Sequence, residues 1–211
     1  MTTQKVQSKI KTSTIAITVL SILLAVAVAS TIVLAAFSAS RTATTTITFG
    51  GGLNMTLTSA ESDDFNAVAA TTDATVTIAA KDNAFAKDNV EMGALSAQTN
   101  QAAYVGFKLS VANGSGTTGT WTYANGVFTN ADAKLKVTFT TTATAGTGDG
   151  VYYFADATTA DTDVTVFSKA VISSTTNSVD DIAGKSISIT ITFKAESVAG
   201  NGNIDNVKTF A

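Results

Sequence analysis

Residues 184–197 read GKSISITITFKAES, a stretch in which apolar and hydroxyl-bearing side chains alternate. Its apolar members are Ile187, Ile189, Ile191 and Phe193, and the residues between them are Ser188, Thr190 and Thr192. A period of two places these two sets on opposite faces of an extended chain. The stretch therefore predicts a strand over Ser186–Phe193, with one face in a core and the other face wet or covered by another subunit.

The same alternation recurs through much of the chain that precedes this strand. The further predicted strands are Ala43–Phe49, Leu53–Thr58, Ala74–Ala79, Tyr104–Val111, Thr118–Tyr123, Val127–Thr129, Leu135–Thr140, Val151–Phe154 and Val164–Ser168. Asn125-Gly126 predicts a type I′ hairpin, and Ser62–Ala70 is the one plausible short helix. Many short strands with regular turns predict an all-β fold, a two-sheet jelly-roll-like sandwich over residues 50–211 without a domain boundary.

The first 36 residues have the pattern of an export signal. Residues 1–13 carry three lysines, and residues 14–37 are uncharged and mostly apolar. A basic segment, an apolar segment and small residues at its end predict a signal peptide over residues 1–36, in the form of a hydrophobic leader helix. We expect a signal peptidase to cut between Ala36 and Phe37, with the bond after Ala39 as second choice, and the product to be secreted.

The length of the apolar segment leaves two alternatives. Its 24 residues exceed the usual core of a signal peptide and suffice to span a bilayer. In one alternative the segment is an uncleaved anchor with its lysine-rich end in the cytoplasm. In the other, the protein is a type IV-like pilin, cut before the apolar segment, which is kept as an assembly helix.

The composition beyond the leader excludes several classes of function. Residues 37–211 hold 10 basic and 16 acidic residues, so we expect no nucleic-acid partner. The chain has no His and no Cys, which excludes Ser-His-Asp and Cys-His catalysis and zinc sites built on these residues. The carboxylate pairs Asp63 with Asp64, Asp161 with Asp163, and Asp180 with Asp181 fall in predicted turns, where Asp is favoured for its local backbone bonds. We therefore expect no enzymatic activity.

Metal and glycan sites rest on short patterns. Calcium takes oxygen ligands on loops. The residues that offer such ligands are Asp149, Asp156, Asp161 and Asp163, and also Asp82, Asn83, Asp88 and Asn89. No segment matches a D-x-D-x-D-G loop, so we expect no metal or other cofactor, with calcium as the alternative. Asn54 and Asn113 begin the acceptor pattern for N-glycosylation.

The segment Phe37–Phe49, which follows the leader, has the features of a detachable strand. Ala43, Thr45, Ile47 and Phe49 share one face, while Thr44, Thr46 and Thr48 share the other. Gly50, Gly51 and Gly52 then form either a flexible hinge or an ordinary hairpin loop. A free terminal strand on a hinge predicts β-strand addition to a neighbouring copy of the chain. Because donor and acceptor surfaces differ, the contact is head-to-tail and propagates into a filament.

Three motifs stand at the two ends of the chain. They are LAAF (Leu34–Phe37), ITFGGGLNMTLTS (Ile47–Ser59) and GKSISITITFKAES (Gly184–Ser197). Together they resemble TasA/camelysin-type biofilm matrix proteins. In that family an Ala-Ala-Phe cleavage region precedes a Thr-rich strand, Gly and a Leu-x-Leu strand, and the closing strand ends in a Phe-x-Ala sequence. The middle of the chain, residues 60–181, is similar only in character.

The resemblance implies a jelly-roll subunit that is exported by the general secretory route and trimmed by a dedicated signal peptidase. It also implies polymerisation into extracellular fibres by N-terminal donor-strand exchange, a plan that archaeal bundling pili share. Some members carry a metalloprotease label, which a chain without His cannot support. The expected function is thus a structural subunit of a biofilm fibre or pilus whose partner is itself. The alternatives are a membrane-anchored or surface-layer β domain that does not polymerise, and the type IV-like pilin.

Overall fold

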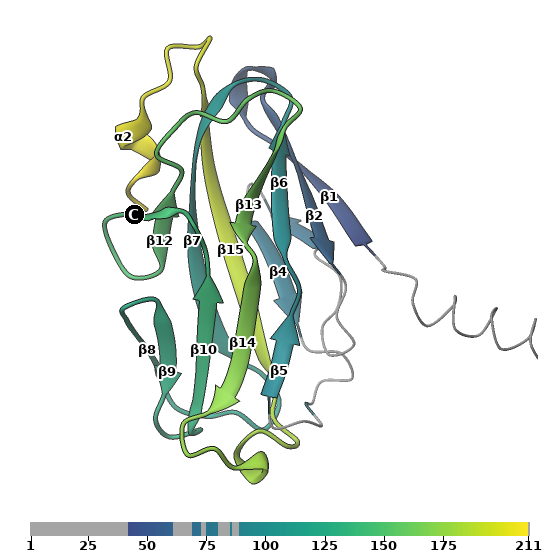
Figure 1. Ribbon diagram of the computed structural model, residues 1–211, viewed down its shortest axis with the longest axis vertical. Helices are drawn as coiled ribbons and strands as arrows, with labels where there is room; N and C mark the ends of the chain where they lie inside the picture. The colour runs from purple at the N-terminus through teal and green to yellow at the C-terminus, as the bar shows by residue number, and fades with distance from the viewer. Residues whose placement is uncertain (1–41, 61–68, 73–74, 80–84, 86–88, 211) are drawn as a thin grey trace, which may run out of the picture. The chain divides into compact units, whose positions relative to one another are not determined.

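The computed structural model describes residues 42–60, 69–72, 75–79, 85 and 89–210. More than half of these residues lie in strands and very few lie in helices, which confirms the predicted all-β class. The strands make three antiparallel sheets, shown in Figure 1. The predicted leader, with Ala36 and Phe37, lies outside the described residues.

The first and second sheets are linked by a pair of long strands. The first sheet has the order β1 (Thr42–Thr48), β2 (Asn54–Ala60), β6 (Leu95–Thr99) and β13 (Asp163–Phe167). The second has the order β5 (Asn89–Met92), β14 (Lys169–Ser174), β10 (Leu135–Thr140), β9 (Val127–Asn130) and β8 (Trp121–Ala124). β5 runs on into β6 and β13 into β14, and the two continuous strands pair along both sheets. The first and second sheets therefore follow one another in a single layer.

The third sheet faces this layer and contains the stretch on which the fold prediction rests. Its order is β11 (Thr144–Ala145), β12 (Val151–Tyr153), β7 (Ala103–Asn113), β15 (Ile187–Ser197), β4 (Thr75–Ala79) and β3 (Ala69–Thr72). β15 pairs with β7 along its whole length, from Ile187 opposite Asn113 to Ser197 opposite Ala103. From Ile187 to Phe193 its apolar residues are buried and its hydroxyl residues half-buried, so the predicted alternation is confirmed there.

The core lies between the third sheet and the layer that faces it. The ring of Phe107 on β7 contacts Phe193 on β15, with ring centroids 6.1 Å apart, and stacks on Tyr152 at 5.5 Å. On the facing layer Phe139 meets Phe167 edge-on at 5.6 Å. One continuous cluster of buried residues includes members of all three sheets. Burial of this apolar surface is the main force that holds the sheets together.

The turns and a few segments refine the sequence-based picture. Asn125 and Gly126 have φ values of 51° and 81° and join β8 to β9, so the predicted type I′ hairpin is confirmed. The predicted helix Ser62–Ala70 is wrong at its end, because Ala69 and Ala70 pair with β4 as part of β3; residues 62–68 lie outside the described residues. Strands β3, β5, β6, β11 and β14 and the short helix α2 (Ile204–Val207) were not predicted.

In the described part of the chain, no helix has the length and apolar character needed to cross a membrane.

Candidate functional site

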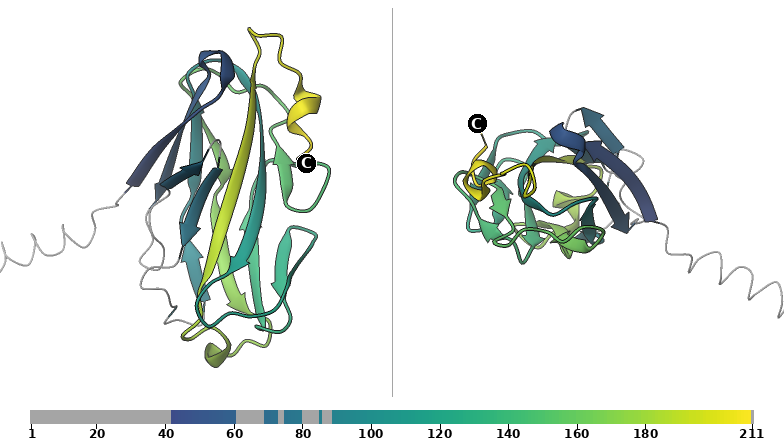
Figure 2. Two further views of the ribbon diagram at one scale, coloured as in Figure 1. Left: turned by 180° about the vertical axis from the view of Figure 1, so that it is seen from behind. Right: turned by 90° about the horizontal axis from the view of Figure 1, so that it is seen from above.

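The N-terminal hairpin, which comprises β1, the 3-10 helix η1 (Gly50–Gly52) and β2, carries the residues of the predicted donor strand. β1 stands at the edge of the first sheet and pairs with β2 alone among the described strands. The pairing covers all seven residues of β1, from Thr42 opposite Ala60 to Thr48 opposite Asn54. Figure 2 shows β1 at the margin of the sandwich, where the chain enters the described region.

The two faces of β1 differ as the sequence predicts. Thr44, Thr46 and Thr48 are exposed, and Thr45 and Phe49 are half-buried. Ile47 is only 4 % exposed and lies opposite the fully buried Met55. Ala43 pairs with Ser59. The inward face of β1 therefore contributes to the core through Ile47, although the strand is held along one edge only.

The three glycines form a closed turn between β1 and β2. Gly51 and Gly52 have φ values of 71° and 77°, a left-handed conformation that L side chains rarely adopt. The amide of Phe49 donates a hydrogen bond of 2.8 Å to the carbonyl oxygen of Leu53 and closes the turn. A side chain at either glycine would meet no other atom within 4 Å, so it is the backbone conformation that requires glycine. In this structure the glycines thus form a hairpin turn, which the sequence predicted as the alternative to a flexible hinge.

Asn100, in the turn between β6 and β7, fastens one end of this glycine turn. Its side-chain amide donates to the carbonyl oxygen of Gly52 over 2.9 Å, and its Oδ1 accepts from the amide of Asn54 over 2.8 Å. The backbone amide of Asn100 also donates to the carbonyl oxygen of Asn54. All three bonds lie on the β2 side of the turn, so β2 is anchored to β6 independently of β1. Sequence analysis missed Asn100, because β6 itself was not predicted.

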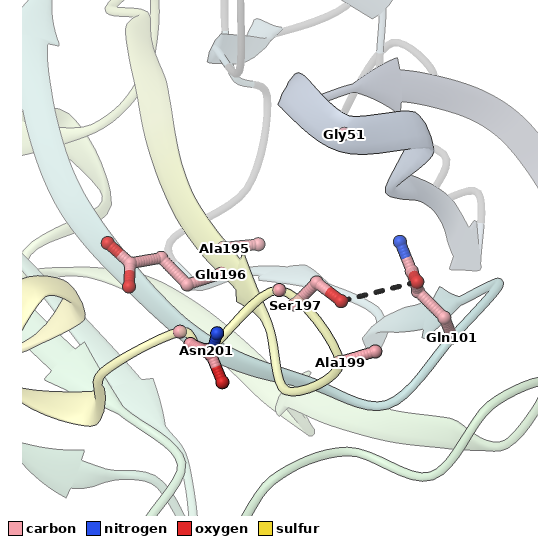
Figure 3. Close-up of a pocket in the computed structure, with 9 residues that line it drawn as sticks. Gly51, Gln101, Ala195, Glu196, Ser197, Ala199 and Asn201 are labelled. Carbon is pink, nitrogen blue, oxygen red and sulfur yellow. Dashed lines mark hydrogen bonds between the residues drawn. The ribbon is translucent and has the colours of Figure 1, made fainter.

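A pocket of about 540 Å³ with a mixed polar and apolar lining lies beside the turn, between Gly51, Gln101 and the end of β15 (Figure 3). Ser197 Oγ donates a hydrogen bond of 3.2 Å to Gln101 Oε1 within it. The carboxylate in its lining, Glu196, is already engaged: its oxygens accept from the amide of Asn203 and from Asn206 Nδ2, each over 2.7 Å. The lining therefore offers hydrogen-bonding groups and small residues but no unengaged carboxylate.

One member of a predicted carboxylate pair, Asp181, is held by hydrogen bonds within the protein. Asp181 is buried, and its Oδ2 accepts hydrogen bonds from Thr176 Oγ1 and, over 2.7 Å, from Ser174 Oγ. These two hydroxyls, followed by Lys134 Nζ at 3.6 Å from Oδ1, hold the pKa of Asp181 below its usual range, against the effect of burial. Asp180 is exposed. Asp63 and Asp64 lie outside the described residues.

The calcium candidates are not gathered into one group. Asp149, Asp156, Asp161 and Asp163 are exposed, and no cluster of three or more acidic side chains occurs within the described ranges. Asn89 begins β5, whereas Asp82, Asn83 and Asp88 fall outside the described residues.

The two glycosylation candidates differ in their surroundings. Asn54 is half-buried in β2, and its Oδ1 is buried. Asn113 is exposed, but its Nδ2 donates to the carbonyl oxygen of Gly119 over 2.7 Å, and its Oδ1 accepts from Trp121 Nε1 over 2.8 Å. A glycan on Asn113 Nδ2 would have to replace the first of these bonds.

The N-terminal hairpin thus contains both the predicted donor strand and the predicted glycine hinge. It combines an uncharged edge strand, a glycine turn and a second strand that is separately anchored to β6. Comparison of the chain with protein-family models, with curated proteins and with solved structures finds no match in any of the three.

Proposed function

We propose that this protein is a non-enzymatic structural subunit of an extracellular fibre or pilus, and that it polymerises through its N-terminal strand. The observation that carries the proposal is the position of β1. It is an uncharged strand at the edge of a sheet, it contributes one buried anchor, Ile47, and glycines join it to the rest of the domain. These are the properties that a donor strand needs for β-strand addition.

The composition favours association of the subunit with its own copies over a monomeric state. An edge strand presents unpaired backbone amides and carbonyls, and proteins usually protect such edges with charged residues or Pro. The chain contains no Pro, and the described strand β1 has no charged residue. The exposed face of β1 consists of threonines, which add no charge repulsion between copies.

The remaining parts of the proposal follow from the sequence. A signal peptidase removes residues 1–36, and Phe37 becomes the first residue of the secreted subunit. The sandwich is jelly-roll-like, and the neighbouring copy receives the donor strand centred on residues 43–49. No cofactor and no nucleic acid take part in this assembly.

Two experiments test the proposal. N-terminal sequencing of the protein recovered from its natural surface or medium should give a start at Phe37. A start near residues 12–14 would identify a type IV-like pilin instead, and Met1 would identify an anchored domain. Second, a variant that lacks residues 37–49 but is still cleaved by signal peptidase after residue 36 should be secreted and form no filaments. If electron microscopy showed normal filaments of this variant, the donor-strand mechanism would be wrong.

A further inference from the structure

We infer that the acceptor of the donor strand is the edge of β2, and that the chain's own β1 occupies this edge until a neighbour's β1 replaces it in the same register. The inference rests on the proposed function, which leaves the acceptor open. It makes the N-terminal hairpin a self-complemented state that delays assembly. The partner is a second copy of this chain.

The first argument is that the pairing of β1 with β2 is complete and specific. All seven residues of β1 have partners on β2, without a bulge. Ile47, opposite Met55, fixes the register, because a slip by one residue would turn this buried side chain to solvent. A neighbour's β1 has the same sequence, so it can make the same ladder and fill the same place in the core. Exchange of an identical element between copies therefore preserves the whole pairing.

The second argument is the unequal anchoring of the glycine turn. Asn100 bonds to Gly52 and Asn54, which belong to the β2 side, and these bonds do not depend on where β1 lies. On the β1 side the turn is closed by the bond from Phe49 to Leu53. Straightening Gly50 and Gly51 therefore releases β1 while β2 remains attached to β6. The acceptor edge stays formed when the donor leaves.

The third argument concerns concentration. A strand tethered by three residues returns to its own β2 far more readily than a strand from a dilute neighbour, since a short tether gives a high effective concentration, on the order of millimolar. The free subunit is thus expected to stay monomeric when dilute. Assembly is expected to set in as the subunit concentration rises, because the ladder that a neighbour's β1 forms with β2 is identical to the ladder that it replaces.

The pair Thr46 and Thr56 allows a direct test. The two residues are directly opposite on the outer face, with their hydroxyl oxygens 3.5 Å apart. The backbone amide and carbonyl of Asn54 both bond to Asn100, away from β1, so by alternation those of Thr56 also point away from β1. Such a non-hydrogen-bonded pair has Cα atoms about 4.5 Å apart, within the span of a disulfide. The chain has no Cys that would interfere.

The first experiment locks the hairpin. The double variant Thr46→Cys/Thr56→Cys, secreted and oxidised while dilute, should remain monomeric at concentrations at which the wild type forms filaments. Reduction should restore filaments. The matched control Thr75→Cys/Thr192→Cys joins directly opposite residues of β4 and β15, whose hydroxyl oxygens are also 3.5 Å apart, and should polymerise in both states. A locked, oxidised Thr46→Cys/Thr56→Cys protein that still formed filaments would overturn the inference, since β1 could not have left β2.

The second experiment identifies the acceptor within the filament. Chains with Thr46→Cys alone are mixed with size-tagged chains that carry Thr56→Cys alone, assembled under reducing conditions and then oxidised. A disulfide between the two kinds of chain is the expected result. The competing acceptor is β13, the other edge of the first sheet, for which Thr165→Cys chains replace the Thr56→Cys chains. Crosslinking to residue 165 in place of residue 56, or to neither in well-formed filaments, would overturn the inference and leave the proposed function standing. If the wild type forms no filaments at all, the proposed function itself fails.

Discussion

Gly106 on β7 lies directly against the carbonyl oxygen of Val207 in α2, and a Cβ atom at residue 106 would overlap that oxygen. Val207 is fully buried, although the short helix to which it belongs is largely solvent-exposed. The absence of a side chain at residue 106 therefore lets the C-terminal segment dock on the outer face of the third sheet.

Gly106→Ala is expected to displace α2 and to lower the free energy of unfolding by about 1–3 kcal/mol, the usual cost of an overpacked contact. Urea denaturation measures the loss, and limited proteolysis should cut the variant near residues 204–210. The control is Gly200→Ala, where the nearest atom to the new Cβ would be 3.5 Å away, an ordinary contact. Equal stability of the two variants would show that the close approach is not needed.

Asn100→Ala should loosen the glycine turn. The substitution removes the side-chain bonds to Gly52 and Asn54 and is expected to cost about 1–2 kcal/mol, since each exposed hydrogen bond contributes about 0.5–1.5 kcal/mol. Hydrogen exchange of the β1 and β2 amides should become faster. The matched variant Asn100→Asp keeps the acceptor for the Asn54 amide and loses the donor to Gly52, so its exchange rates should fall between those of the wild type and Asn100→Ala. Unchanged rates in both variants would contradict the anchoring role of Asn100.

Substitutions at Ile47 should weaken the pairing of β1 with β2 equally within a subunit and between subunits. Ile47→Val is expected to cost about 1 kcal/mol and Ile47→Ala about 2 kcal/mol or more, because the deleted methyl groups leave a cavity next to Met55. Urea denaturation of the dilute monomer measures this loss, and sedimentation measures the concentration at which filaments appear. Thr48→Ala, at an exposed position of the same strand, should change stability by no more than about 0.5 kcal/mol. The neighbour's β1 makes the same Ile47 contact with Met55 as the chain's own β1, so the concentration at which filaments appear should stay nearly the same in the three variants while the free energy of unfolding ranks them. A large rise in that concentration for Ile47→Ala would contradict the shared register.

The accuracy of the sequence-based predictions depends on how regular each strand is. β10 was predicted because it alternates over its length, and β15 was predicted as far as Phe193 because it alternates from Ile187 to that residue. β14 was missed because it follows a register shift near the end of β13, where Val166 and Phe167 are buried in succession and the period of two is lost. β5 and β6 contain charged, amide and small residues that do not stand out as a strand pattern.

The candidate site shows the same limit of prediction from local sequence patterns. The alternation in Thr44–Phe49 and the run of three glycines are local features, and both could be recognised in the sequence. The bonds from Asn100 to Gly52 and Asn54 join segments about 46–48 residues apart, which no local pattern encodes. Asn100 follows a strand that was itself missed. Its role depends on a tertiary contact that only the assembled sheet creates.

Stability should fall in acid partly through Asp181. Bonds from Thr176 and Ser174, and the charge of Lys134, lower the pKa of this carboxyl in the folded protein below its ordinary value of 3.8. The unfolded chain therefore takes up the proton first as the pH falls. The stabilising effect is complete above the ordinary value, declines below it, and is gone once the pH passes the lower folded pKa. Asp181→Asn should remove this part of the pH dependence, so urea denaturation between about pH 6 and pH 2 should give a shallower decline for the variant. The neighbouring, exposed Asp180→Asn serves as control and should retain the wild-type slope. If Asp181→Asn and the wild type lost stability in parallel, the hydroxyl bonds to Asp181 would not favour its ionised form.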